Sequence, residues 1–357
     1  MRNREEINDL LDYFQNMEGK PLRFDEEAIV SAYQKTSDNQ SLPIKILSII
    51  GGILASLAFL GFLFIAGLYD SDFGMLLFGG IFIAGSIWIN KQYDKIIIDT
   101  LSVSSFIIGF ILIGLGLGQL QTSENLICIV FIMVAIGSLA IVQNYILSFV
   151  SVLIINGSIL TLIISNEAYN LIHMHVSVLA LTTGYFILKE AKIISINRTF
   201  SKLYNPIRIG LVFSLLSGLV ILGKRGILPV SADYIWISSI IVMASILYLG
   251  SRLFIILSIT ETRLKITIYI VTALMLLPTA LSPAISGAIL IILLSFYANY
   301  KTGLVLGIIS FIYFISQYYY DLHFTLLTKS ILLFASGVLF IALYLFTHKR
   351  LTTNEKI

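Results

Sequence analysis

Long apolar runs separated by short polar segments make up most of this chain. Most runs approach the roughly 20 residues that a helix needs to cross about 30 Å of hydrocarbon. The pattern predicts an all-α fold, a polytopic bundle of about twelve transmembrane helices within residues 44–347. The run at 209–222 is short, so it needs flanking residues, a thinner bilayer or burial in the bundle. The runs lie at about 45–68, 73–89, 96–120, 126–142, 145–164, 171–188, 209–222, 234–250, 266–281, 284–298, 303–318 and 325–346.

The two ends of the chain are polar. Residues 1–43 carry one apolar stripe at helical spacing, after which Gly19 and Pro21 break the chain. A second helix capped by Asp25 completes a short amphipathic pair, which is too small to bury a core alone. We expect this cytoplasmic pair to dock on the bundle or on a partner, and residues 348–357 to form a cytoplasmic tail. The stripe consists of Ile7, Leu10, Leu11 and Phe14.

Lysine and arginine residues divide unevenly between the predicted loops. With a cytoplasmic amino terminus, 20 of the 23 basic residues fall on the cytoplasmic side and 3 on the outer side, in line with the positive-inside rule. Both termini are therefore predicted to be cytoplasmic. In this count residues 250–265 are interpreted as an interfacial helix rather than a span, because Leu253–Ile259 is apolar but closely flanked by Arg252 and Glu261.

Composition supports a membrane protein and excludes several other classes. Hydrophobic residues are 57% of the chain and mean hydropathy is +0.94, so a water-soluble domain could not bury this much apolar surface. The net charge of +3 is too small and too scattered for nucleic-acid binding. Cys128 is the single cysteine, which excludes an internal disulfide and a cysteine-built zinc site. No cofactor is indicated, and frequent Ile, Lys and Asn favour a bacterial inner-membrane protein in contact with the lipid bilayer.

The principal candidate site lies where the last apolar run begins. Asp321, Thr325 and Lys329 follow one another at intervals of four residues, so they lie on nearly the same face of a helix. A lysine inside a membrane helix is costly and is a functional candidate by default. The alternative is that Lys329 extends to the outer headgroups. The full candidate cluster is Tyr319, Tyr320, Asp321, His323, Thr325, Lys329 and Ser330.

Two histidines are secondary candidates at an expected outer helix end. His173 and His175 could both bind a metal only in an extended loop. Asp321 and His323 are available to complete such a set, and Glu167 lies nearby in the sequence. On a helix the two histidines lie about 200° apart and cannot share a site. Interfacial or pore-lining roles are therefore favoured, and no metal site is predicted.

Other charged residues have two open interpretations each. Asp99, near the cytoplasmic end of the third run, is either part of a proton relay or an interfacial acid beside Lys91 and Lys95. Lys224 and Arg225 form an outer basic pair. That pair either contacts anionic headgroups or occupies an ordinary solvated turn.

Glycine and asparagine residues recur in this framework. The pair Gly79-Gly80 and the series Gly114, Gly116 and Gly118 predict close helix packing rather than a nucleotide loop, because the glycine series lies wholly inside a span. Asparagine recurs in three expected cytoplasmic turns. Repeated helical hairpins or an ordinary interfacial preference would explain this. The three residues are Asn90, Asn144 and Asn299.

The chain resembles a known family near both ends of the bundle. Towards the carboxy terminus it reads Tyr319-Tyr320-x-Leu322-x-x-Thr325-Leu326-Leu327-x-Lys329-Ser330, followed by an apolar helix with Gly337. Towards the amino terminus it reads Leu42-Pro43-Ile44-Lys45-Ile46-Leu47-Ser48. These patterns are similar to a bacterial membrane family catalogued as domain-of-unknown-function family 4401. The resemblance implies a multi-span inner-membrane protein, often accompanied by a companion membrane protein with a Gly-Asp-Tyr motif, and it supplies no activity.

Three functions remain open. Many spans, short loops and sparse buried polar groups are typical of a transporter or flippase-like carrier of a small or lipid-linked solute. The alternative is a non-catalytic membrane subunit for assembly, sensing or envelope maintenance, acting with a partner membrane protein. An enzyme is disfavoured, because a lipid-linked transferase needs a large polar outer loop that the short outer segments do not supply. A stable stoichiometric partner would favour the subunit, and solute-dependent stabilisation would favour the carrier.

Overall fold

The computed structural model describes residues 42–321 except 93–95, 225 and 257–260, together with isolated positions of the last apolar run. The predicted amino-terminal helical pair and carboxy-terminal tail fall outside the described residues. So do four of the candidate site residues, namely Arg225, His323, Thr325 and Lys329.

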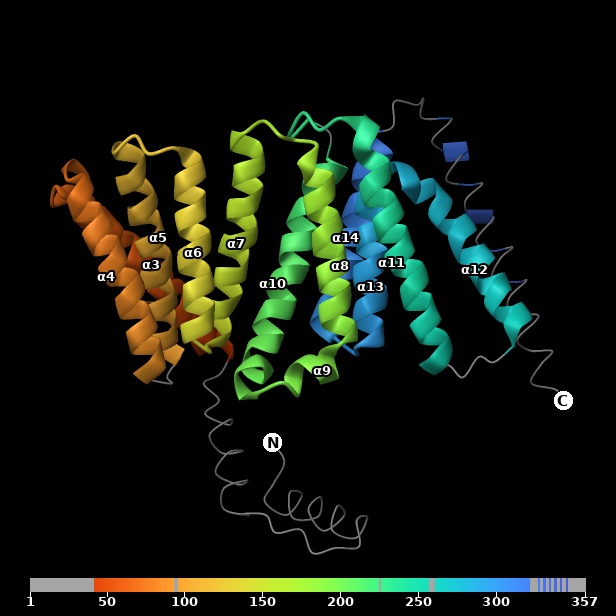
Figure 1. Cartoon of the computed structure of the whole chain (residues 1–357), viewed down its shortest axis with the longest axis horizontal. Helices are drawn as coiled ribbons and strands as arrows, with labels where there is room; N and C mark the ends of the chain where they lie inside the picture. The colour runs from red at the N-terminus through yellow and green to blue at the C-terminus, as the bar shows by residue number, and fades with distance from the viewer. Residues whose placement is uncertain are drawn as a thin grey trace, which may run out of the picture.

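The described elements are all helical, which confirms the predicted fold class, and each predicted run up to 303–318 coincides with a helix (Figure 1). By length and composition, nine of the described helices can cross a membrane, and α13 is a shorter apolar helix. Short 3-10 helices precede α4, α11 and α13; they are η1 (Leu68–Asp70), η2 (Ala232–Tyr234) and η3 (Leu277–Leu281). The α-helices are α3 (Leu42–Ile65), α4 (Asp72–Gln92), α5 (Ile96–Gln119), α6 (Glu124–Ile141), α7 (Tyr145–Ser165), α8 (Leu171–Leu188), α9 (Glu190–Ile194), α10 (Arg198–Gly223), α11 (Ile235–Ile256), α12 (Thr262–Leu276), α13 (Pro283–Tyr297) and α14 (Lys301–Asp321).

The long helices stand side by side in a broad array, and α4–α8 alternate in direction along the chain (Figure 1). The helices α3–α7 form one half of this array and α8–α14 the other, with α12 at an edge. The short helix α9 lies across one end of the array, which we call the α9 end; the opposite end is called the distal end. Each long helix therefore presents one terminus to each end.

One expectation about helix limits is confirmed and another is wrong. The short run 209–222 is extended by flanking residues, which was one of its three alternatives, because it is the second part of α10, which has 26 residues. Its polar first turns are helical because the side chain of Asn197 accepts a hydrogen bond from the Phe200 N–H at 2.8 Å and caps the helix. Residues 251–256 are not an interfacial helix, because they continue α11. Phe254 is buried there and meets the Tyr269 ring of α12 edge-on at 5.1 Å.

Close packing at glycine joins α4 to α5, as the sequence predicts for Gly79. A Cβ atom on Gly79 would lie 2.9 Å from the Gly109 carbonyl oxygen, and one on Gly109 would lie 2.8 Å from the Gly79 oxygen. Gly114 packs in the same way against Phe131, and Gly116 against Leu76. By contrast, Gly80 and Gly118 would meet nothing within 4 Å, so the prediction does not extend to them.

The main core lies among α8, α10, α11 and α13. Fully buried side chains from these four helices interlock there, and they include Leu179, Leu215, Leu219, Leu249 and Leu290. Smaller apolar clusters hold α3–α7 together. The two halves meet where α10 approaches α7, and Gly210 leaves room there for the side chain of Val152. The larger half therefore contains the deepest interior of the described chain.

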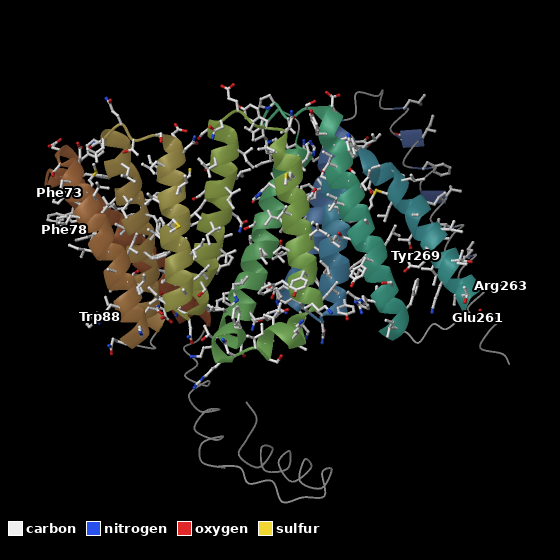
Figure 2. The ribbon with its side chains drawn as sticks, in the orientation of Figure 1. Phe73, Phe78, Trp88, Glu261, Arg263 and Tyr269 are labelled. Carbon is white, nitrogen blue, oxygen red and sulfur yellow. The ribbon has the colours of Figure 1, made fainter. Side chains whose placement is uncertain are left out.

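Large apolar side chains also project outwards from the array. Phe73, Phe78 and Trp88 extend away from α4 at the edge of the molecule (Figure 2), and the Phe73 side chain is 74% exposed. Hydrocarbon accepts such surfaces, whereas water does not. The outward face of α4 is therefore suited to lipid.

Candidate functional site

A cavity of about 1120 Å³, with a mostly apolar lining that includes several polar side chains, lies at the distal end, where α8, α10, α13 and α14 converge. Its charged and titratable lining residues are His173 of α8, Lys224 after α10, and Asp321 at the end of α14. Ser282, just before α13, and Tyr318 of α14 add hydroxyl groups. The structure thus brings together two residues that the sequence places in separate candidate sites, His173 and Asp321.

His173 is only 2% exposed, although it lines this cavity. Its Nδ1 atom lies 2.9 Å from the Ser238 hydroxyl oxygen of α11. Its Nε2 atom is buried and has no hydrogen-bond partner within the described chain. A buried imidazole nitrogen without a partner calls for an explanation, such as a ligand or water. His173 therefore has one nitrogen fixed by the protein and one available to an occupant of the cavity.

His175 lies two positions further along the same helix and does not line the cavity. This agrees with the expectation that helical geometry keeps the two histidines from sharing a site. Within the described ranges, no group of three or more His, Cys, Asp and Glu side chains converges in a way that could hold a metal ion. Glu167 is exposed in the turn between α7 and α8, with a positive φ of 53°, and it lies outside the cavity lining.

Of the predicted carboxy-terminal cluster, the structure describes Tyr319, Tyr320, Asp321 and Ser330. Asp321 accepts a hydrogen bond from the Gln317 side-chain amide at 3.0 Å and lines the cavity. Tyr320 is exposed and does not line it, although its ring contacts that of Tyr319. Ser330 is exposed in helical conformation. Tyr318, which the sequence analysis did not single out, is the tyrosine of this group that lines the cavity.

Further buried polar atoms without partners lie on the helices below the cavity. Besides His173 Nε2, the described chain leaves unpaired the hydroxyl oxygens of Thr183 on α8, Ser214 on α10 and Ser295 on α13. These three helices pack against one another in the main core. His173 lies near the distal end of α8, whereas Ser295 lies near the α9 end of α13. Polar atoms therefore recur along the interior between the two ends.

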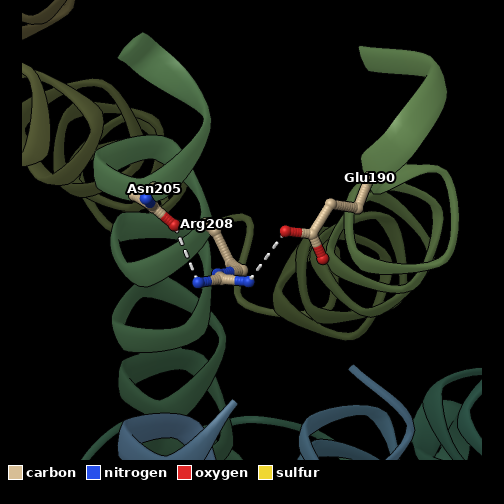
Figure 3. A network of polar contacts seen from close by, with 3 residues as sticks. All are labelled: Glu190, Asn205 and Arg208. Atoms are coloured by element: carbon tan, nitrogen blue, oxygen red, sulfur yellow. Dashed lines mark hydrogen bonds and ion pairs between the residues drawn. The ribbon is translucent and has the colours of Figure 1, made fainter. Parts of the chain in front are cut away.

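A charged network closes the α9 end, and the sequence analysis missed it. The Arg208 guanidinium donates a hydrogen bond to Asn205 Oδ1 at 2.8 Å, and its Nη1 atom lies 3.7 Å from Glu190 Oε1 (Figure 3). Its carbon centre lies 3.9 Å from the centroid of the Tyr300 ring and 5.0 Å from that of Tyr204. The Arg208 side chain is 11% exposed and that of Glu190 is 38% exposed. The network joins α9, α10 and the turn before α14.

Burial raises the pKa of the Tyr300 hydroxyl, and the neighbouring Arg208 charge opposes this shift. The phenol therefore stays protonated near neutral pH, so that the guanidinium stacks on a neutral ring. Arginine suits this position because its charge persists on burial and its flat face stacks on aromatic rings. The end of the core nearest α9 is thus closed by a cation held between two rings.

Asp99 accepts hydrogen bonds from two asparagine side chains. The side-chain amides of Asn90 on α4 and Asn144 before α7 donate to its Oδ1 atom at 3.2 Å and 3.1 Å. Asn144 also caps α7, because its own Oδ1 accepts from the N–H groups of Ile146 and Leu147. Two of the three recurring asparagine turns therefore meet at one acid. This geometry gives Asp99 a role in joining helices, and a relay role remains a prediction.

Helices long and apolar enough to cross a bilayer, with aromatic side chains on an outward face, define a polytopic helical membrane protein. The family described as domain of unknown function DUF4401 matches residues 41–350. The chain belongs to this family, which confirms the resemblance found in the sequence. No curated protein and no solved structure matches the chain.

Proposed function

We propose that this integral membrane protein is a carrier that admits a small polar solute through the distal cavity. The observation that carries the proposal is the lining of that cavity, where Lys224 and Asp321 offer opposite charges and His173 Nε2 has no hydrogen-bond partner among the described residues. The volume of about 1120 Å³ is slightly larger than that of typical small-molecule sites, roughly 300–1,000 Å³. Such a cavity can hold a solute together with water.

A short helix that begins at the cavity supports the same function. The 3-10 helix η3 connects α12 to α13 at the distal end, and α13 has 15 residues and is therefore about 22 Å long, shorter than the roughly 30 Å hydrocarbon layer. Leu281 and Ser282 at this junction line the cavity. Irregular backbone at membrane depth is tolerated where it borders a cavity, so this junction suits a cavity wall.

The interior below the cavity fits a carrier in one of its closed states. The unpaired hydroxyl groups of Thr183, Ser214 and Ser295 recur between the cavity and the α9 end. The core around them is tightly packed, so a solute would pass only if α8, α10 and α13 moved relative to one another. At the α9 end the Arg208 network ties α10 to α9 and to the turn before α14. Release there would require that network to open.

The experiment is a ligand screen on the full-length chain in lipid nanodiscs. Thermal unfolding is followed with and without amino acids, organic anions, amines and sugars, and any stabilising solute is then tested for uptake into liposomes. We expect a solute that stabilises the wild type to lose its effect in Lys224→Gln and Asp321→Asn. The matched control is Asp70→Asn, because Asp70 is an exposed acid in η1, in the other half of the array.

Two outcomes would reject the carrier. One is the absence of any stabilisation or uptake across the screen. The other is a stoichiometric membrane protein that co-purifies with the chain and without which the chain has no cellular effect. The second outcome would establish the alternative, a non-catalytic subunit that acts with a partner in assembly, sensing or envelope maintenance.

A further inference from the structure

A second cavity, separate from the distal one, opens between α8 and α11 towards the α9 end. Its volume is about 440 Å³. Ala180, Gly184 and Ala244 form its walls with little side-chain bulk, and Leu290 and Leu294 of α13 form its floor. We call this cavity the α8–α11 slot.

The slot is apolar except at its end nearest α9. Its single serine, Ser245, donates its hydroxyl hydrogen to the Ile241 carbonyl oxygen at 2.7 Å, so that group is satisfied within its own helix. A Cβ atom on Gly184 would meet nothing within 4 Å, so the space beside it is open. The residues that line α8 recur at helical spacing from Ala180 to Leu188, and they therefore form a groove parallel to the helix axis. An elongated apolar chain fits such a groove.

The end of the slot nearest α9 is polar and positively charged. Lys189 and Tyr248 line the slot there. Arg252, one turn further along α11, donates to the Tyr248 hydroxyl oxygen from Nη2 at 2.7 Å and from Nε at 3.3 Å. Tyr185 also lines the slot and is 58% exposed. Exposed tyrosines beside Lys and Arg are typical of the level at which a helix passes from hydrocarbon to headgroups.

The two basic residues at this mouth are available to an anion. Within the described chain, neither Lys189 nor Arg252 lies in an ion pair, and the adjacent acid Glu190 is held by Arg208. The bonds from Arg252 to Tyr248 leave its Nη1 group free to donate. Charged hydrogen bonds from arginine and lysine to phosphate are among the strongest that proteins make.

We propose that the α8–α11 slot binds an anionic phospholipid. One acyl chain lies along the groove, and the phosphate and its anionic headgroup lie between Lys189 and Arg252. The groove supplies apolar contact that any phospholipid can use, and the two cations supply the preference for an anionic headgroup. The bound lipid covers a gap between α8 and α11 and holds these two helices of the main core together.

The test compares two lipids that differ only in the headgroup. The full-length protein is purified in detergent, incubated with phosphatidylglycerol or with phosphatidylcholine of the same acyl chains, and analysed by native mass spectrometry and thermal unfolding. We expect phosphatidylglycerol to be retained and to raise the unfolding temperature more than phosphatidylcholine does. In the double variant Lys189→Gln/Arg252→Gln, its affinity should fall roughly tenfold or more, because each basic residue near a lipid surface contributes about 1 kcal/mol.

Two further variants separate the groove from the charges. Gly184→Phe fills the open space and should weaken both lipids, whereas Lys189→Arg/Arg252→Lys keeps the charges and should retain phosphatidylglycerol. The matched control is Lys192→Gln/Lys202→Gln, which removes two exposed cations from the same end without touching the slot. The proposal is rejected if this control weakens phosphatidylglycerol as much as the slot variant does, or if the wild type binds the two lipids equally.

Discussion

Arg208 is a charged side chain that lies largely buried at the α9 end of the bundle. It is held by one amide, one carboxylate and two aromatic rings, which belong to Asn205, Glu190, Tyr204 and Tyr300. Stacking on the two tyrosine rings requires a flat cation. The hydrogen bond to the Asn205 side chain requires an N–H group that points in a fixed direction. Lysine has the same charge but neither of these properties. The network therefore depends on the shape of the guanidinium group more than on its charge.

We expect Arg208→Lys to destabilise the protein by about 1–2 kcal/mol, because the stacking over two rings and the bond to Asn205 are lost. Thermal unfolding in detergent measures this as a lower midpoint. Arg198→Lys is the matched control, because Arg198 is exposed at the start of the same helix, and its effect should stay within about 0.5 kcal/mol. Equal midpoints for the two variants would show that the stacking contributes nothing.

Some of the residues described above could be singled out from the sequence, and others could not. His173 and Asp321 stand out because charge and imidazole are rare in apolar runs, but no local pattern shows that they line one cavity. Arg208 escaped notice because residues 189–208 were counted as a basic loop. The available signal was the spacing of Tyr204, Asn205 and Arg208, which places polar groups one helical turn apart once the segment is known to be helical.

Helix pairs in this molecule depend on how closely two backbones approach. The α4–α5 pair is the clearest case, since Gly79 and Gly109 each occupy the space that a side chain on the other would need. In a bilayer, helices associate largely through such van der Waals contact, because lipid tails are as apolar as leucine. A single added methyl group at this point forces the two helices apart.

We expect Gly79→Ala to destabilise the protein by about 1–3 kcal/mol, as overpacked cores do. Gly80→Ala, one position further along α4, should be neutral or slightly stabilising, because its new methyl group meets nothing within 4 Å and alanine favours helix. The two unfolding midpoints, measured in one detergent, give the comparison. A tolerated Gly79→Ala beside a damaging Gly80→Ala would contradict the packing described here.

Helix limits were harder to predict than helix existence. The apolar runs 209–222 and 234–250 locate α10 and α11, but each run covers only the apolar part of its helix. The first turns of α10 are polar because they contain the Arg208 network, and the last turns of α11 carry Arg252 beside the α8–α11 slot. Both helices therefore extend further than their apolar runs, because polar and charged residues occupy their ends.

The whole molecule presents two chemically different ends. The α9 end carries Lys91, Lys189, Lys202, Arg263 and Lys301 at or near helix termini, whereas the distal end carries Asp72, Glu124 and Asp233 together with Lys224. From the positive-inside rule we predict that the basic end faces the cytoplasm. The array thus has the charge asymmetry that the sequence analysis used to orient it.

We expect cysteines introduced at Asp72, Glu124 and Asp233 to react with an impermeant reagent from outside the cell. Cysteines at Lys91 and Lys202 should react only after permeabilisation. The experiment uses a Cys128→Ala background, because Cys128 is the single native cysteine. Labelling of Lys202 in intact cells would place α9 outside and reverse the proposed orientation.

The sequence pattern predicts that many helices cross the membrane, but not how they are arranged. A repeated apolar run contains no information about which neighbour it meets. The arrangement depends on particular contacts, such as Gly210 against Val152 and Gly287 against Leu219, whose partners are distant along the chain. The separation into two halves and the position of the cavity therefore became visible only in three dimensions.

The two hydrogen bonds at Asp99 also imply an order of events during synthesis. Asn90 precedes Asp99 by nine positions, so its bond can form as soon as the α4–α5 hairpin enters the membrane. Asn144 emerges from the ribosome 45 positions after Asp99, and its bond can form only when α7 begins to insert. The Asp99 carboxylate thus first links the two helices of one hairpin, α4 and α5, and later links that hairpin to the start of α7. A nascent chain that stalls after α6 would contain the first connection but could not yet have the second.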